Sequence, residues 1–97
     1  MIKTMSEIQE ILRGYKKYLI RKYKIKNLGI FGSYCRGEAN ENSDIDIIVE
    51  FCEPIGLGFI DLAFELEEIL NQKVDLVSKS GIKPKYYKCI QEDLVYV

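Results

Sequence analysis

The sequence predicts an α+β fold, a small mixed β-sheet with helices packed on it. Apolar residues recur with helical spacing in two long segments, and they alternate along 45–51 as in a half-buried strand. Turn residues separate these segments, so helices and strands follow one another along the chain. A chain of 97 residues with 47% hydrophobic content is large enough for one core without disulfides, so we expect a single domain over 1–97.

The first predicted element is a helix with Ser6 as its expected N-cap. Its buried stripe consists of apolar residues at helical spacing, namely Ile8, Ile11, Leu12, Tyr15 and Leu19. A short buried strand is predicted over 26–31, and 32–37 is expected to be a tight turn that leads into about one helical turn. After the polar loop 38–43, the alternation along 45–51 predicts the second strand.

Pro54 and Gly56 end this strand, and a second amphipathic helix is predicted over 57–70. Its expected inward residues are Phe59, Leu62, Ala63, Leu66, Ile69 and Leu70. The apolar run 74–77 predicts a third strand, and 78–81 a turn.

A last helix is predicted from Pro84 to about residue 92, because the first turn of a helix tolerates proline. The residues expected to pack inward are Tyr87, Ile90 and Leu94. Residues 95–97 are expected to form an extended tail.

The composition excludes several kinds of chemistry. The chain has no histidine, which rules out a Ser-His-Asp or Cys-His triad, an HExxH zinc site and an imidazole base. Cys35, Cys52 and Cys89 are odd in number and widely spaced, so we expect neither a disulfide framework nor a zinc ribbon, and interpret them as small core residues. Catalysis would therefore rely on carboxylates, hydroxyls, lysines, arginines or a metal bound by oxygen.

No apolar run approaches the roughly 20 residues of a membrane span. The first residues also lack the apolar stretch of a signal peptide. We therefore expect a cytoplasmic protein that does not associate with membranes.

Charge is distributed unevenly along the chain. Residues 1–26 carry eight basic side chains against two acids, whereas residues 38–75 carry eleven acids against one lysine. One interpretation is that solvated helix faces simply differ in sign. The alternative is a basic helix for an anionic partner beside an acidic site for cations. The net charge of −1 argues against nucleic acid as a partner.

Three aspartates form the candidate catalytic group. Asp44 and Asp46 are two residues apart on a predicted strand, so their side chains point to one face with Cα atoms about 6.6 to 6.8 Å apart. Asp75 lies in the third predicted strand, and three carboxylates meet if that strand lies beside the second. Such a cluster needs a cation, and an all-oxygen ligand set favours Mg²⁺ or Mn²⁺ over zinc.

The same residues also allow structural interpretations. Asp44 can simply start a strand, Asp46 can face solvent, and Asp75 can pair with a lysine or with Arg36. Gly32 and Ser33 can be an ordinary turn, or a turn whose N–H groups and hydroxyl bind phosphate oxygens.

Arg36 can likewise bind a phosphate or a pyrophosphate leaving group, or it can form an ion pair with Asp44 or Glu38.

Taken together, the motif consists of Gly32-Ser33, ten residues, Asp44-Ile45-Asp46 and a later Asp75. This arrangement resembles the signature of the polymerase-β-like nucleotidyltransferase superfamily. The fuller strings Phe31-Gly32-Ser33-Tyr34-Cys35-Arg36-Gly37 and Ser43-Asp44-Ile45-Asp46 resemble the minimal nucleotidyltransferases, the MntA-like antitoxins paired with HEPN-domain (HepT-like) toxins. The resemblance covers nearly the whole chain and implies a polymerase-β-like core.

The resemblance also implies residue roles. Asp44, Asp46 and Asp75 would be catalytic and would bind Mg²⁺ or Mn²⁺, with ATP as substrate. Gly32, Ser33 and Arg36 would bind the nucleotide phosphates.

The leading hypothesis is an antitoxin that transfers AMP from ATP to a tyrosine of a HEPN ribonuclease toxin. About 20 residues follow Asp75, so we expect the toxin to bring its own docking surface. The basic first helix and three C-terminal tyrosines are candidate contacts for it: Tyr86, Tyr87 and Tyr96. The alternative hypothesis is an antitoxin of the same fold that only binds and masks the toxin.

Overall fold

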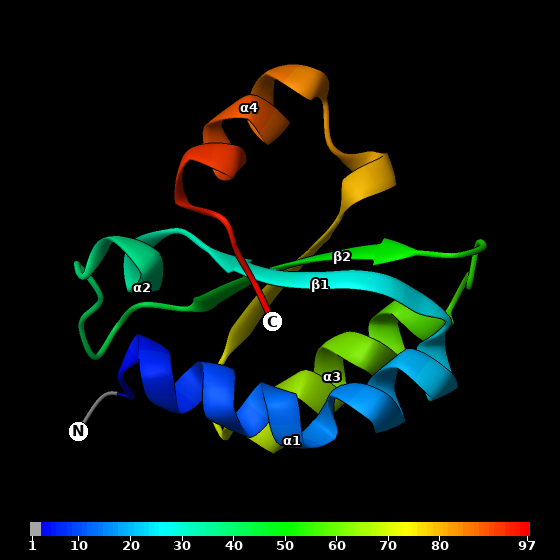
Figure 1. Cartoon of the computed structure of the whole chain (residues 1–97), viewed down its shortest axis with the longest axis horizontal. Helices are drawn as coiled ribbons and strands as arrows, with labels where there is room; N and C mark the ends of the chain where they lie inside the picture. The colour runs from blue at the N-terminus through cyan, green and yellow to red at the C-terminus, as the bar shows by residue number, and fades with distance from the viewer. Residues whose placement is uncertain (1–2) are drawn as a thin grey trace.

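A four-stranded mixed sheet separates two layers of helices (Figure 1). The computed structural model describes residues 3–97. The strands are β1 (Ile25–Phe31), β2 (Ile45–Phe51), β3 (Val74–Ser78) and β4 (Val95–Tyr96), in the order β3-β2-β1-β4. Strand β1 pairs antiparallel with β2 and β4, while β2 pairs parallel with β3. The predicted α+β class with a mixed sheet is confirmed.

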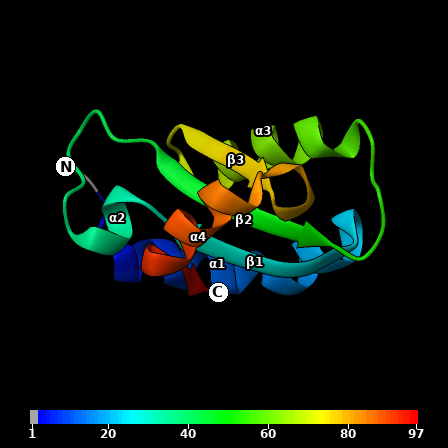
Figure 2. The ribbon, with the colours of Figure 1, turned by 90° about the horizontal axis from the view of Figure 1, so that it is seen from above.

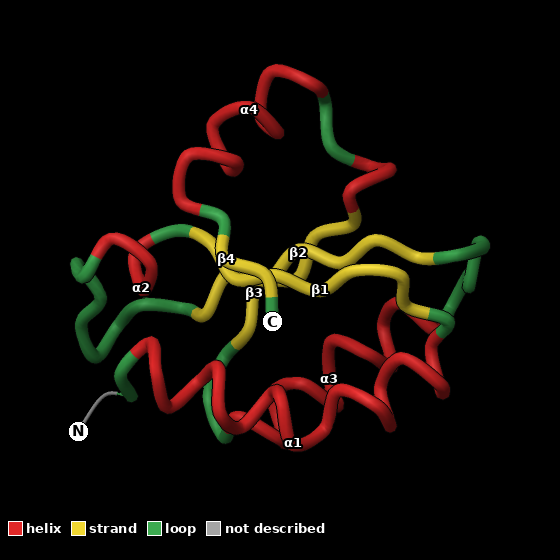
Figure 3. Tube along the Cα trace, viewed as in Figure 1, coloured by secondary structure: helices red, strands yellow, loops and turns green. Residues whose placement is uncertain are grey.

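Helices α1 (Met5–Tyr23) and α3 (Gly58–Leu70) cover one face of the sheet (Figure 3). Each helix directs one stripe of residues inward, and every second residue of β2 points toward them because side chains alternate along a strand. The fully buried side chains of this core are Ile8, Leu12, Leu19, Ile30, Ile45, Ile47, Val49, Leu62, Leu66 and Leu70. These fully buried side chains lie on the α1 and α3 side of the sheet, while Ile48 of β2, 4% exposed, points to the other face.

Helix α1 begins earlier than predicted. Its N-cap is Thr4, not Ser6, because Thr4 and Glu7 form a capping box. The Glu7 N–H donates to Thr4 Oγ1 at 3.2 Å, and the Thr4 N–H donates to Glu7 Oε1 at 2.9 Å. Tyr15, expected in the buried stripe, is 45% exposed. The stripe instead continues from Leu19 to the buried Tyr23, the last residue of the helix.

The opposite face carries a thinner layer, formed by the 3₁₀ turn η1 (Lys79–Gly81) and helix α4 (Pro84–Asp93), which crosses above β1 and β2 (Figure 2). No residue of α4 is buried, and the predicted inward residues Tyr87, Ile90 and Leu94 are half-buried. Cys52 and Cys89 are exposed, so interpreting them as core residues was wrong, while Cys35 is half-buried. This face of the sheet is therefore only partly covered.

A polar contact links α1 to α3 beside the core. The Tyr23 hydroxyl donates to Glu65 Oε1 at 2.5 Å, and Lys22 Nζ contacts the same oxygen at 2.9 Å. Burial alone raises the pKa of Glu65, but hydrogen bonds from two tyrosines and Lys22 lower it to about 2.

Within residues 3–97, no helix has the length and apolar character needed to cross a membrane.

Replacing Glu65 with Ala should destabilise the fold by about 1 to 2 kcal/mol, because the Tyr23 hydroxyl loses its acceptor. Urea unfolding at neutral pH measures the effect, with the exposed Glu68→Ala as the matched control on the same helix. Since the folded-state pKa of Glu65 lies below its ordinary 4.5, the difference between the two variants should persist above that pH and vanish toward pH 2. Equal stabilities of the two variants at neutral pH would contradict this account.

Candidate active site

The parallel pairing of β2 with β3 places two of the predicted acids side by side. Asp46 and Asp75 are partners in the register of this pair. Ile45 and Ile47 on either side of Asp46 are fully buried in the core, so Asp46 points to the other face, the one that α4 partly covers. Asp44 lies immediately before β2, two residues from Asp46 and therefore toward the same face.

Asp44, Asp46 and Asp75 form an acid row on this face, and the charges of the other two act on Asp46. Its pKa is raised from 3.8 to about 6, first by partial burial and then by the negative charges of Asp75 and Asp44. The positive charge of Arg36 opposes this rise only weakly. The site therefore concentrates negative charge with little compensation from the protein itself, which is the electrostatic condition for binding a cation.

Gly32 lets the turn after β1 lie directly against Asp46. Its φ of +80° belongs to the left-handed side of backbone space, which favours glycine. A Cβ atom at this position would overlap the carboxylate of Asp46. Ser33 follows as the first residue of the short helix α2 (Ser33–Arg36), so the predicted turn with one helical turn is confirmed. The glycine and the acid of the motif are thus in physical contact.

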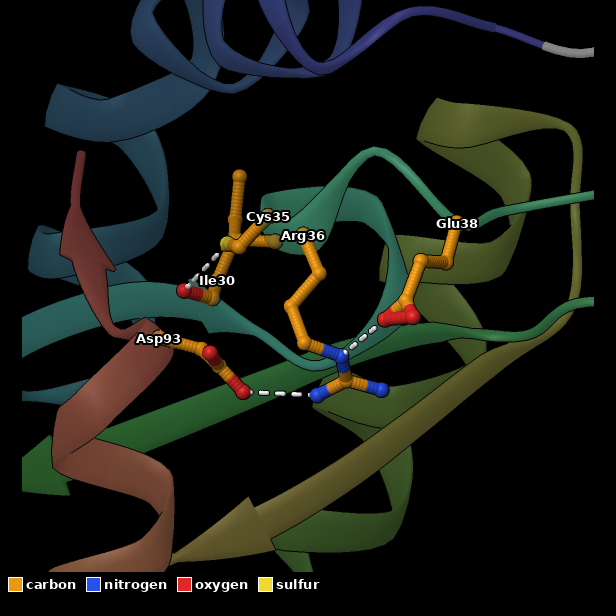
Figure 4. Close-up of polar contacts among 5 residues, drawn as sticks. All are labelled: Ile30, Cys35, Arg36, Glu38 and Asp93. Atoms are coloured by element: carbon orange, nitrogen blue, oxygen red, sulfur yellow. Dashed lines mark hydrogen bonds and ion pairs between the residues drawn. The ribbon is translucent and has the colours of Figure 1, made fainter.

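Arg36 extends from α2 toward the C-terminal end of α4 (Figure 4). Its Nε donates to Glu38 Oε1 at 2.6 Å, and an η nitrogen donates to Asp93 Oδ2, also at 2.6 Å. The predicted ion pair with Glu38 is present, whereas Asp93, the last residue of α4, was not predicted as a partner. No local pattern in the sequence signals this contact, since 57 residues separate Arg36 from Asp93.

Gln72 is a second supporting residue that the sequence did not reveal. Its side-chain amide donates to the hydroxyl of the buried Tyr34 and to the carbonyl of Ser43 at 3.3 Å. Ser43 directly precedes Asp44, so Gln72 ties α2 to the start of the acid row. The contact depends on the turn between α3 and β3 reaching across to α2, which sequence periodicity does not report.

The three acids do not form a ready-made ligand cage. Within residues 3–97, no three side chains of His, Cys, Asp or Glu are gathered closely enough to hold a metal ion as placed. The expectation that three carboxylates meet at one point is therefore met only in part, and Asp75 is exposed. Two carboxylates about 4 Å apart would repel by on the order of 4 kcal/mol at an effective dielectric near 20, so gathering the acids closely requires a bound cation. The three side chains offer only carboxylate oxygens, which are the ligands that Mg²⁺ and Mn²⁺ prefer. The raised pKa of Asp46 shows that its negative charge is unfavourable without a bound cation.

The fold and this site define a nucleotidyltransferase domain. The family model described as "Nucleotidyltransferase domain" matches residues 12–97. The chain belongs to this family, and within it to the MntA-like minimal nucleotidyltransferases. The enzyme class expected from the sequence, a nucleotidyltransferase, is thereby confirmed.

Two relatives in sequence span nearly the same length as this chain. The protein adenylyltransferase MntA of Thermococcus cleftensis is 46% identical over 95 residues, covering 97% of this chain and 96% of the relative. A protein of Methanocaldococcus jannaschii, provisionally named a protein adenylyltransferase, is 55% identical over 98 residues, covering 99% of this chain and all of the relative.

Solved structures show the same architecture. A provisionally named minimal nucleotidyltransferase is 29% identical with a TM-score of 0.75, covering 95% of this chain and 90% of the other. A toxin-antitoxin structure with AMP-PNP is 27% identical with a TM-score of 0.72, covering 86% of this chain and 69% of the other. An MNT antitoxin in complex with a tri-AMPylated HEPN toxin of Shewanella oneidensis is 24% identical with a TM-score of 0.68, covering 92% and 70%, a likeness of fold alone.

Replacing Gly32 with Ala should cost about 3 kcal/mol or more, because the added Cβ meets the Asp46 carboxylate and the backbone conformation is left-handed. Gly37 is the matched control: its φ is also positive, at +71°, but a Cβ there meets nothing within 4 Å. Gly37→Ala should therefore cost only about 1 kcal/mol. Guanidinium unfolding of both variants tests the contact, and equal losses would contradict it.

Replacing Asp46 with Asn should stabilise the folded chain above about pH 6. The pKa of Asp46 is about 6 in the folded state and 3.8 in the unfolded chain, so the folded state keeps the Asp46 proton to a higher pH. This proton binding favours folding fully below pH 3.8, and the contribution is lost as the pH rises through about 6. The melting temperature of the variant in metal-free buffer should exceed that of the unchanged chain by roughly 2 to 4 °C near pH 7.5.

The difference should disappear near pH 4. Asp61→Asn, an exposed acid on α3, is the control and should show no such pH-dependent gain. A variant at position 46 that is less stable than the unchanged chain at neutral pH would disprove the electrostatic account.

Proposed function

We propose that this chain is a protein adenylyltransferase that transfers AMP from ATP to a tyrosine of a HEPN-domain ribonuclease toxin and thereby silences it as an antitoxin. The observation that carries the proposal is the in-register pairing of Asp46 with Asp75, with Asp44 two residues away. The names of the sequence relatives support protein adenylylation, and the neighbour with AMP-PNP supports an adenine nucleotide and a toxin partner. The choice of a HEPN toxin rests on the resemblance of the motif and the shared fold.

Two of the acids would act on the nucleotide and the third on the acceptor. Asp44 and Asp46 would hold Mg²⁺, or Mn²⁺, on the triphosphate of ATP, and Asp75 would complete the site on the acceptor side. When bound, the ion neutralises phosphate charge and acidifies a nearby hydroxyl. The acceptor oxygen attacks the α-phosphorus and the bond to the β-phosphate oxygen breaks. The phenolic proton passes to Asp75, and pyrophosphate leaves.

The turn after β1 would bind the phosphates. Gly32 brings its backbone against the Asp46 carboxylate, so a phosphate held there would lie beside the acid row. Ser33 adds a hydroxyl at the start of α2. Arg36 forms ion pairs with Glu38 and Asp93. Both pairs are partly exposed, so salt weakens them and a phosphate can compete for the guanidinium. Phosphate binding by Arg36 would therefore replace at least one of these ion pairs.

Two remaining expectations belong to the same proposal. Residues 1–97 would act as one nucleotidyltransferase domain, because the buried side chains form a single cluster shared by α1, α3 and the sheet. The protein would act in the cytoplasm, where ATP is available, with neither a membrane nor nucleic acid as its partner.

Transfer of radioactive label from the α-phosphate of ATP to a HEPN toxin tests the proposal. The unchanged chain should label the toxin when Mg²⁺ is added. The double variant Asp44→Asn, Asp46→Asn and the single variant Asp75→Asn should each reduce the rate at least about 100-fold, as expected when charge stabilisation of the transition state is lost. Asp61→Asn should label at the unchanged rate. Normal labelling by the double variant would refute the proposed role of the acids.

A masking antitoxin is the second candidate, favoured by one observation. Two large apolar side chains are exposed on α3, Ile60 at 52% and Phe64 at 63%, and a third, Leu57 at 81%, directly precedes the helix. A partner bound to this stripe would bury it without any chemistry. Ribonuclease inhibition that persists without ATP and metal, and reverses when the two proteins are separated, would favour masking over AMP transfer.

A further inference from the structure

A cleft opens beside Asp75, between the acid end of the sheet and α4. Its volume is about 520 Å³. Phe31, Asp75 and Val77 line it from β1 and β3, and residues after β3 line it from the other side, among them Ile82, Tyr86 and Ile90. The sheet residues share one face: Val77 is two residues from Asp75, and Phe31 is the partner of Asp46 in the β1–β2 register. The cleft therefore lies beside the acid row.

The walls of the cleft are largely apolar and aromatic. Phe31 and Tyr86 contribute rings, and Val77, Ile82 and Ile90 contribute aliphatic groups. Asp75 is the only acid in the wall, and Lys83 is the only cation. Such walls bind a flat aromatic group through stacking and apolar contact, and a single carboxylate accepts one O–H donor.

The lining separates the cleft from the proposed phosphate site. Gly32 and Ser33, which would bind the phosphates, and Asp44, which would hold the metal on them, do not line it. Asp75, assigned to the acceptor side, does. A nucleobase edge requires several donors and acceptors, whereas this cleft offers the Asp75 carboxylate and the Lys83 ammonium in otherwise largely apolar walls. The lining fits the phenol better.

We propose that this cleft is the acceptor subsite, which seats the ring of the tyrosine to be modified and orients its hydroxyl toward Asp75. This inference rests on the proposed function, whose acceptor it locates. Helix α4 can supply the contact because it is not committed to the core: none of its residues is buried, and Tyr86 is 63% exposed. Tyr86 would act by holding the acceptor ring and would take no part in the chemical step.

Ligand mapping by NMR tests the cleft without any enzymatic turnover. The isotope-labelled full chain is titrated separately with N-acetyl-tyrosinamide and with AMP-PNP in Mg²⁺. The tyrosine probe should shift the signals of Val77, Tyr86 and Ile90, and AMP-PNP should shift those of Gly32 and Ser33. The inference is overturned if AMP-PNP shifts the cleft signals while the tyrosine probe leaves them unchanged, or if the tyrosine probe shifts no cleft signal up to its solubility limit.

Steady-state kinetics of toxin labelling give the second readout. Tyr86→Ser should raise KM for the acceptor about five- to tenfold, the loss expected for one aromatic contact, and leave KM for ATP unchanged. Tyr86→Phe should restore the acceptor KM, because the ring is kept. The matched control is Gln91→Ser, an exposed residue of the same helix that does not line the cleft. A rise in KM for ATP alone would assign the cleft to the nucleobase and overturn the inference.

The two proposals fail separately. If the unchanged chain transfers no AMP, the proposed function fails while the NMR titration still decides whether the cleft binds a phenol. If labelling proceeds normally and Tyr86→Ser changes neither KM, the acceptor subsite fails while the proposed function stands.

Discussion

The structure depends on one constraint, the parallel pairing of β2 with β3 that sets Asp46 beside Asp75. Neighbouring strands lie about 4.8 Å apart. Two carboxylates brought that close would repel by roughly 3 to 4 kcal/mol at an effective dielectric near 20. The fully buried residues that flank Asp46 on β2, Ile45 and Ile47, hold the strand in register, so the core on one face stabilises an unfavourable charge arrangement on the other.

The surrounding contacts keep this acid row open and in place. Gly32 brings the turn after β1 against Asp46, and Gln72 ties that turn to the residue before Asp44. Arg36 donates to Asp93 on α4, so its positive charge neutralises the acid row only in part. The thin α4 layer leaves the face accessible, and the proposed acceptor cleft lies beneath it. Core packing and access to the site are thus divided between the two faces of one sheet.

The parts of the fold that local patterns encode could be predicted from the sequence. Strand β2 was predicted with its observed bounds because its alternation is regular, and β1, β3 and α3 differ from prediction by one residue at an end. Thr4 was missed although Thr4 and Glu7 carry a capping-box signal. The contacts of Asp93 and Gln72 could not be predicted, since each joins segments far apart in sequence. The exposure of Cys89 follows from the loose packing of α4, which hydrophobic character alone does not reveal.

The most direct test of the central claim is where a divalent cation binds. Crystals of the unchanged chain grown with Mn²⁺ and AMP-PNP, measured for anomalous scattering, locate the ion without any assumption about activity. The account predicts an anomalous peak at the carboxylates of Asp44 and Asp46, beside the triphosphate, with Asp75 completing the site. A well-ordered nucleotide whose Mn²⁺ lies away from these acids would contradict it.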